Sequence, residues 1–273
     1  MKAEKPWLDQ LYHKYNHPKW IHPDPLEFVH NYPDPLDQEV VGLIASCLAY
    51  GRVTLILSSV RIILEPMGSS PRDFLLATDE HFWSSLYEGF RHRFTTVDHL
   101  VALLSGMKRA IGRYGSLGEC FSSHMHKDHL TIINALAGFV RDLKDGENSY
   151  NSLLPLPEKG SACKRLHLFL RWMIRRDSVD PGPWKDIPCS VLVIPLDTHM
   201  YKICSRLGLT CRKSADQKCA MEITEHFREI CPHDPVKYDF ALSRLGIRSE
   251  GFLMPDGSIL AVSQEKIDSN TYL

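Results

Sequence analysis

The sequence lacks a long apolar run and has no excess of charge of either sign. The longest apolar stretch, around residues 191–196 and bounded by prolines, has the length of a strand, whereas a membrane helix needs about 20 apolar residues. The 32 Lys and Arg residues nearly match the 33 Asp and Glu residues, which gives a net charge of −1. This balance argues against a strongly cationic DNA-coating protein, although a local basic patch would suffice for an enzyme acting on nucleic acid.

A secretory signal and a metal-binding cysteine pattern are also missing. Residues 1–20 mix charged and aromatic side chains without an apolar core, so we expect a cytoplasmic protein with reduced thiols. None of the 8 cysteines forms a Cys-x-x-Cys pair, and no spacing supports a zinc finger or an iron–sulfur cluster. For His124, His126 and His129 we favour a solvated surface over a metal tract. We therefore predict structural thiols, no bound metal and no cofactor.

The chain has no internal repeat at a period of about 20 to 50 residues, which argues against a solenoid. Instead, apolar residues recur at helical spacing in many segments. The expected helices cover residues 38–50 with Asp37 as N-cap, 54–64, a stretch from Thr96 onward, 130–143, 161–176, a stretch from Asp197 to Leu207, 216–230 and 235–245. The segment 251–273 contains a Pro-Asp-Gly turn between two short β-prone runs, which predicts a hairpin. We predict an all-α fold in a single domain spanning residues 1–273.

The helix expected at 161–176 has the clearest pattern. Leu166, Phe169, Leu170, Met173 and Ile174 form one apolar stripe, and Ser161 is a candidate cap. Basic residues also gather within this helix, as they do at 91–93 and 108–113. A solvated helix face explains each of these basic clusters taken singly.

The segment 194–208 carries the pattern Pro-Leu-Asp197-Thr-His199 followed by Arg-Leu-Gly208. It resembles a segment of the helix-hairpin-helix DNA glycosylases, in which the aspartate is catalytic and opens a helix. The layout is most similar to that of the archaeal 8-oxoguanine glycosylases, with Lys164 near the start of a helix, then Asp-Ile-Pro at 186–188, then Asp197. Residues 43–50 are similar to an early helix of that family, whose end lines the base pocket. One feature departs from the family: no Leu-Pro-Gly-Val-Gly hairpin precedes the lysine.

The chain also resembles a largely uncharacterised bacterial protein family. The resemblance covers most of the chain and rests on three segments, at 164–173, 195–199 and 238–247. It implies no activity of its own.

The glycosylase resemblance implies a helix-hairpin-helix bundle of two lobes with a cleft between them. It also implies base-excision repair of double-stranded DNA by a monomeric N-glycosylase and abasic-site lyase. A damaged purine such as 8-oxoguanine is the expected substrate, with Lys164 as nucleophile and Asp197 as the carboxylate. These residue types suit the chemistry, because a carboxylate stabilises positive charge on the sugar and a lysine can form a Schiff base at C1′.

Four further residues are predicted to bind substrate: Tyr50, Arg52, Trp172 and His199. A base extruded from the duplex needs an aromatic partner, and Trp172, Trp184, Tyr50 and Phe94 are the stacking candidates. Structural roles compete with several of these predictions: Asp197 fits a simple N-cap, Lys164 a surface lysine, Trp172 the edge of the core and His199 a structural histidine.

Two other functions remain open at this stage. In the glycosylase family the glycine hairpin binds phosphate through backbone N–H groups. Because this chain lacks that hairpin, one alternative is a protein with a glycosylase-like fold that binds nucleic acid without cutting it. A helical protein with an unrelated metabolic role that merely shares the capping motif is the other.

Overall fold

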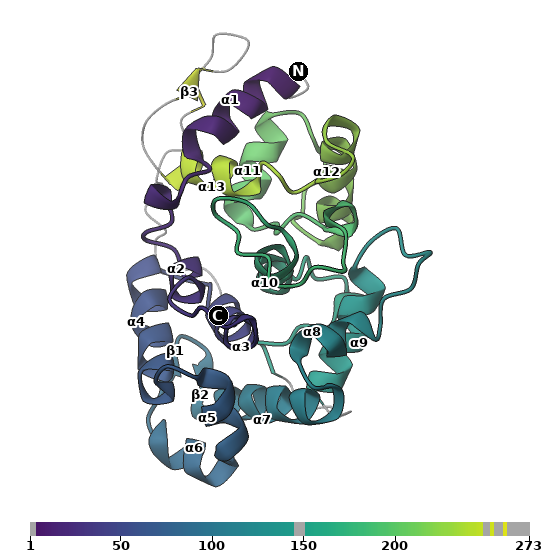
Figure 1. Cartoon of the computed structure of the whole chain (residues 1–273). Coiled ribbons are helices and arrows are strands. Elements are labelled where there is room, and N and C mark those ends of the chain that lie inside the picture. The colour runs from purple at the N-terminus through teal and green to yellow at the C-terminus, as the bar shows by residue number, and fades with distance from the viewer. Residues whose placement is uncertain (1–3, 145–150, 248–251, 254–258, 261–273) are drawn as a thin grey trace.

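The computed structural model describes residues 4–144, 151–247, 252–253 and 259–260, and within these ranges the chain is mainly helical (Figure 1). The prediction of an all-α fold is confirmed. The α-helices are α1 (Lys5–Tyr15), α2 (Leu26–Val29), α3 (Pro35–Cys47), α4 (Val53–Leu64), α5 (Pro71–Ala77), α6 (Glu80–Leu86), α7 (Val97–Tyr114), α8 (Leu117–Ser122), α9 (Ile133–Lys144), α10 (Lys164–Ile174), α11 (Thr198–Arg206), α12 (Gln217–Ile230) and α13 (Asp239–Ile247). The described ranges also contain 3₁₀ turns at Pro18–Trp20, Glu65–Met67, Pro157–Lys159 and Cys189–Val191.

Two short antiparallel strand pairs accompany the helices. Strands β1 (Arg91–His92) and β2 (Thr95–Thr96) pair through Arg91 with Thr96 and His92 with Thr95. Strands β3 (Phe252–Leu253) and β4 (Ile259–Leu260) form the second pair. The hairpin predicted within 251–273 is thus present in its paired residues, while the rest of that segment lies outside the described residues.

Helices α3 and α10 pack against each other at the centre of the molecule (Figure 1). Gly42 of α3 makes this close approach possible, because a Cβ at that position would lie 2.8 Å from the Met173 Cε atom of α10. Every residue of α10 from Leu166 to Ile174 is buried. The predicted apolar stripe is therefore confirmed, but it is only one part of a helix that is surrounded on all sides.

Other helices cover this central pair at its two ends. Helix α1 packs on α13, and α13 on α11, at one end; α7, α8 and α9 pack together at the other (Figure 1). Gly106 of α7 lies directly beneath α9, since a Cβ there would meet the Leu143 carbonyl oxygen at 2.1 Å. The buried apolar side chains of all these helices belong to one continuous core.

Buried charges join α10 to its neighbours. Arg171 pairs with Asp180 at 3.0 Å and also with Asp239 at the start of α13. Arg175 pairs with Asp180 at 2.9 Å and, through its Nε atom, with Asp234 at 2.8 Å. Opposite charges compensate one another here, which a buried ion requires.

Helix starts differ from the sequence prediction at two caps and agree with it at a third. Asp34, rather than Asp37, caps α3 by accepting the Leu36 N–H, whereas Asp37 is buried in the first turn and accepts the Arg72 N–H. Helix α10 begins after Cys163, which has a left-handed backbone, so Ser161 does not cap it. Asp216 caps α12 as the pattern indicated. Among the described residues, no helix is both long and apolar enough to cross a bilayer.

Candidate active site

Lys164 and Asp197 lie side by side in the folded chain. The Lys164 Nζ atom is 3.7 Å from Asp197 Oδ2, and the two side chains are 28% and 43% exposed. Lys164 is the first residue of α10, and Asp197 is the N-cap of α11. The structure thus brings together an amine and a carboxylate from the starts of two different helices, and solvent reaches both groups.

The capping role of Asp197 fixes the direction of its carboxylate. Oδ1 accepts the Met200 N–H at 2.8 Å, which leaves Oδ2 facing Lys164. The N-terminus of a helix also stabilises a negative charge, because its backbone N–H groups point outward. A structural cap and an oriented catalytic carboxylate are therefore compatible in this one residue.

The start of α10 is held on the end of α3 by its two cationic side chains. Lys164 Nζ donates to the Ala49 carbonyl at 3.3 Å. Arg165 donates to the Cys47 carbonyl at 2.7 Å and also to the Ser152 carbonyl. Carbonyl groups at a helix C-terminus carry partial negative charge, so they attract these cations. This anchoring holds the Lys164 backbone and amine in place beside α11.

Tyr50 joins the end of α3 to the β1–β2 hairpin. Its hydroxyl donates to the His92 carbonyl at 2.8 Å and lies 2.7 Å from the Thr95 hydroxyl. The Arg165 guanidinium lies over its ring at 4.8 Å. Tyr50 therefore lies close to the start of α10, where its hydroxyl is already engaged and only its partly exposed ring remains for contact with a ligand.

The tip of the hairpin presents an exposed aromatic residue next to cations. Phe94 is 72% exposed, and the Arg93 guanidinium lies 5.3 Å from its ring centre. Arg93 has a φ of 54°, a left-handed conformation that costs a non-glycine residue about 1 kcal/mol. A Cβ on Gly51 would lie 2.9 Å from Arg93 Cδ, so the tip rests directly on the chain that follows Tyr50.

The hairpin is the feature that sequence analysis missed. Residues 91–93 were interpreted as a basic cluster on a helix face, and the structure corrects this to the first strand and turn of the hairpin. The turn has no Asn-Gly or Asp-Gly signal, which is the usual mark of a two-residue hairpin. The β-branched pair Thr95-Thr96 was the one local hint of a strand.

Arg52 and His199 are two further residues predicted to bind substrate. Arg52 is exposed at the N-terminus of α4, two residues after Tyr50. His199 lies in the first turn of α11 beside Asp197, and its buried Nε2 atom has no hydrogen-bond partner among the described residues. Burial lowers the pKa of His199, the charge of Lys202 lowers it further, and Asp197 opposes the shift. His199 thus offers a neutral, unsatisfied polar atom close to Asp197.

Trp172 is not a binding residue, which corrects the prediction. Its side chain is 0% exposed. Helix α10 is enclosed on every side, so Trp172 is buried in the core together with the apolar stripe of the same helix. Trp184 is also buried, at 8% exposure, where it stacks on Phe121 at 5.5 Å. Of the four aromatic residues suggested for stacking on a base, Tyr50 and Phe94 alone are accessible.

Two surface hollows lie away from these two residues. One is lined by residues of α12 with Arg212, and the other by residues of α6 and α7 with Asn151. Neither includes Lys164 or Asp197. The one cluster of metal-ligand types in the described part of the chain is Cys120, His124 and Asp142, also away from this pair.

A family model described as "Protein of unknown function (DUF2400)" matches residues 24–248. The chain belongs to the DUF2400 family. The matched region contains Lys164, Asp197 and the β1–β2 hairpin, whereas α1 precedes it. No curated protein and no solved structure matches the chain.

Proposed function

We propose that this DUF2400 protein is a DNA base-excision-repair enzyme, an N-glycosylase with abasic-site lyase activity on a damaged purine such as 8-oxoguanine. The observation that carries the proposal is the 3.7 Å approach of Lys164 Nζ to Asp197 Oδ2 at a solvent-reached position. The helix cap directs the Asp197 carboxylate toward Lys164, and this orientation favours a shared chemical role for the two groups. The finer fold is part of the same proposal: two helical lobes of the helix-hairpin-helix glycosylase type, with the nucleotide bound between them.

The chemistry follows from these two groups. A neutral Lys164 amine attacks C1′ of the damaged nucleotide, and the C1′–N bond breaks with its electrons leaving on the base, which takes up a proton. The Asp197 carboxylate stabilises the positive charge that develops on the sugar and accepts the proton that the attacking amine loses. The sugar ring then opens, its oxygen takes a proton, and C1′ becomes doubly bonded to Nζ. Loss of a C2′ proton from this Schiff base then expels the 3′ phosphate as the C3′–O bond breaks, which cleaves the strand.

The hairpin tip supplies the contacts that duplex DNA requires. Arg91 and Arg93 of the hairpin, and Arg52 shortly after Tyr50 in the chain, are exposed cations that would contact phosphates. The exposed ring of Phe94 would enter the duplex where the damaged nucleotide leaves it, because an apolar wedge compensates lost stacking. The partly exposed ring of Tyr50 is then available to the extruded nucleotide, whereas the Nε2 atom of His199 is buried.

Borohydride trapping of the purified full chain tests this function. Duplex oligonucleotides carrying 8-oxoguanine, other oxidised or alkylated purines, or an abasic site are incubated with the protein and borohydride. We expect a covalent protein–DNA adduct with at least one of these substrates, because borohydride reduces the imine to a stable amine. Lys164→Ala should form no adduct, whereas Lys218→Ala, which alters an exposed lysine of α12, should match the parent.

Three results separate the competing functions. Adduct formation that survives Lys164→Ala would assign the nucleophile to another residue and overturn this mechanism. DNA binding that weakens with salt, without base release or trapping on any lesion, would favour a binding protein that does not cut. No binding even at low salt would contradict every nucleic-acid function and leave the metabolic alternative.

A further inference from the structure

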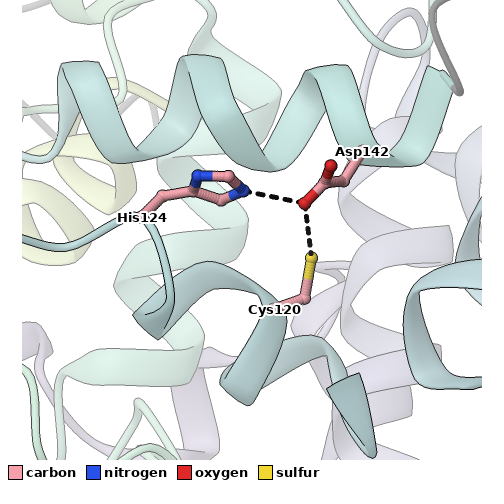
Figure 2. A group of neighbouring side chains, drawn as sticks. All are labelled: Cys120, His124 and Asp142. Atoms are coloured by element: carbon pink, nitrogen blue, oxygen red, sulfur yellow. Dashed lines mark hydrogen bonds and ion pairs between the residues drawn. The ribbon is translucent and has the colours of Figure 1, made fainter. Parts of the chain in front are cut away.

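Cys120, His124 and Asp142 meet at the far side of the core from α11, where α8 packs on α9 (Figure 2). Cys120 lies within α8, His124 follows that helix, and Asp142 is in the last turn of α9. One ligand atom from each lies within 4.8 Å of the others. Figure 2 shows the His124 ring and the Cys120 sulfur both directed at the same oxygen of Asp142.

We propose that Cys120, His124 and Asp142 bind a zinc ion. Thiolate, imidazole and carboxylate are the three side-chain types that zinc takes in proteins, and this mixture of soft and hard donors does not suit calcium or magnesium. His124 Nε2 is 2.8 Å from Asp142 Oδ2, and Cys120 Sγ is 3.7 Å from the same oxygen. Bond lengths of about 2.0 to 2.3 Å at tetrahedral angles place ligand atoms about 3.3 to 3.7 Å apart. Small side-chain rotations therefore convert the observed arrangement into a zinc shell.

The cluster is electrostatically suited to a cation. The Asp142 carboxylate lies beside the buried Cys120 sulfur, and a divalent ion between the two would compensate its negative charge. Arg113, 3.8 Å from the other Asp142 oxygen, is the opposing positive charge, but its side chain is 71% exposed and solvent screens it.

Two neighbouring residues hold the ligands in place. A Cβ at Gly138 would lie 2.5 Å from the His124 ring, so only glycine at that position of α9 lets the imidazole reach Asp142. The Tyr114 hydroxyl donates to Asp142 Oδ2 at 2.7 Å, which is how partners outside a metal shell orient a ligating carboxylate. His124 and Asp142 are 29% and 20% exposed, so a water can complete the fourth position.

Cobalt substitution tests this site with a signal that a simple hydrogen-bonded cluster cannot give. The full chain is stripped with a chelator, desalted and titrated with Co²⁺. We expect a thiolate-to-cobalt charge-transfer band in the near ultraviolet and strong visible d–d bands of a four-coordinate ion, at one equivalent. Added Zn²⁺ should abolish both by displacement.

Matched variants assign the bands to these residues. Cys120→Ser should remove the charge-transfer band, and Gly138→Ala should weaken cobalt binding at least tenfold by pushing His124 away. Cys211→Ser, which removes the exposed thiol most open to adventitious metal, should leave the spectrum unchanged, as should Lys164→Ala. Absence of both bands in the parent, or a charge-transfer band that persists in Cys120→Ser, would overturn the proposal. Should Cys120→Ser fail to fold by circular dichroism, the Gly138→Ala and Cys211→Ser titrations decide the outcome.

Discussion

Lys164 and Asp197 face each other across 3.7 Å although a helix and a long connection separate them in the chain. Each is fixed by a different part of its own backbone. Lys164 is held by the carbonyl groups at the end of α3, and Asp197 by the first turn of α11. The relationship therefore depends on how α3, α10 and α11 pack, and it would be lost if any of the three moved.

Replacing Asp197 by asparagine separates its structural role from its chemical one. Asparagine caps a helix as well as aspartate does, so Asp197→Asn should change the free energy of unfolding by less than about 1 kcal/mol. Trapping and base release should nevertheless fall by about 100-fold or more, because the carboxylate charge is gone. Urea unfolding and borohydride trapping measure the two effects. Full activity in Asp197→Asn would mean that the residue serves only as a cap.

Replacing Phe94 by alanine tests the wedge at the hairpin tip. The side chain is 72% exposed, so Phe94→Ala should alter stability by less than about 0.5 kcal/mol. Excision from duplex DNA should fall by about tenfold or more, while excision from a single strand, whose bases are already unstacked, should change little. Leu130→Ala, at an 85% exposed position between α8 and α9, is the control and should leave both rates unchanged. Equal losses on both substrates would argue against a wedge.

Removing the Arg171 charge should destabilise the protein strongly. Arg171, Asp180 and Asp239 are 4%, 0% and 3% exposed, so Arg171→Met removes the cation that pairs with the buried Asp239 and leaves the buried Asp180 with Arg175 alone. We expect a loss of about 3 to 5 kcal/mol in the free energy of unfolding. Arg212→Met, which breaks the 2.6 Å contact with Glu222 at a partly exposed position, should cost less than about 1 kcal/mol. Comparable losses of stability in the two variants would show that burial does not determine how much removal of an ion pair destabilises the protein.

His167 should make the protein less stable in acid. It is 1% exposed, and burial alone lowers its pKa from 6.5 to about 4. Between these two pH values the unfolded chain binds a proton that the folded chain does not, so stability falls as the pH drops below 6.5. Between pH 7 and pH 5 the expected loss from this residue is on the order of 2 kcal/mol.

Urea unfolding of the parent and of His167→Leu at both pH values checks this. Other groups titrate in the same way in both proteins, so the difference between the two pH dependences isolates the histidine. Identical dependences would mean that His167 accepts a proton in the folded state.

The candidate site could be predicted in part. The Asp-Thr-His pattern located Asp197 at a helix start, because capping is a local event that a short segment specifies. The same reasoning did not find the β1–β2 hairpin, whose strands have two residues each and whose turn relies on Arg93 in a left-handed conformation. Its stability comes from contacts with Tyr50 and Ser59, which are distant in sequence.

Trp172 is a second residue whose environment the local sequence pattern did not determine. Trp172 lies one residue away from the apolar stripe of α10, so the sequence pattern was compatible with a buried side chain and with an exposed one. The outcome depended on what packs against the other face of the helix, and helices on every side enclose it. The sequence pattern did not indicate the Cys120–His124–Asp142 cluster either, because Asp142 comes from a different helix.

The sequence by itself determined the helical class, most helix positions and the placement of Asp197 at the start of α11, because periodicity and capping are properties of neighbouring residues. Only the tertiary structure decided that Lys164 lies beside Asp197, that Trp172 is enclosed, and that Phe94 projects from a hairpin resting on Gly51. Those outcomes follow from packing between segments far apart in the chain, where helix-to-helix contact, rather than local pattern, sets the distance between two side chains.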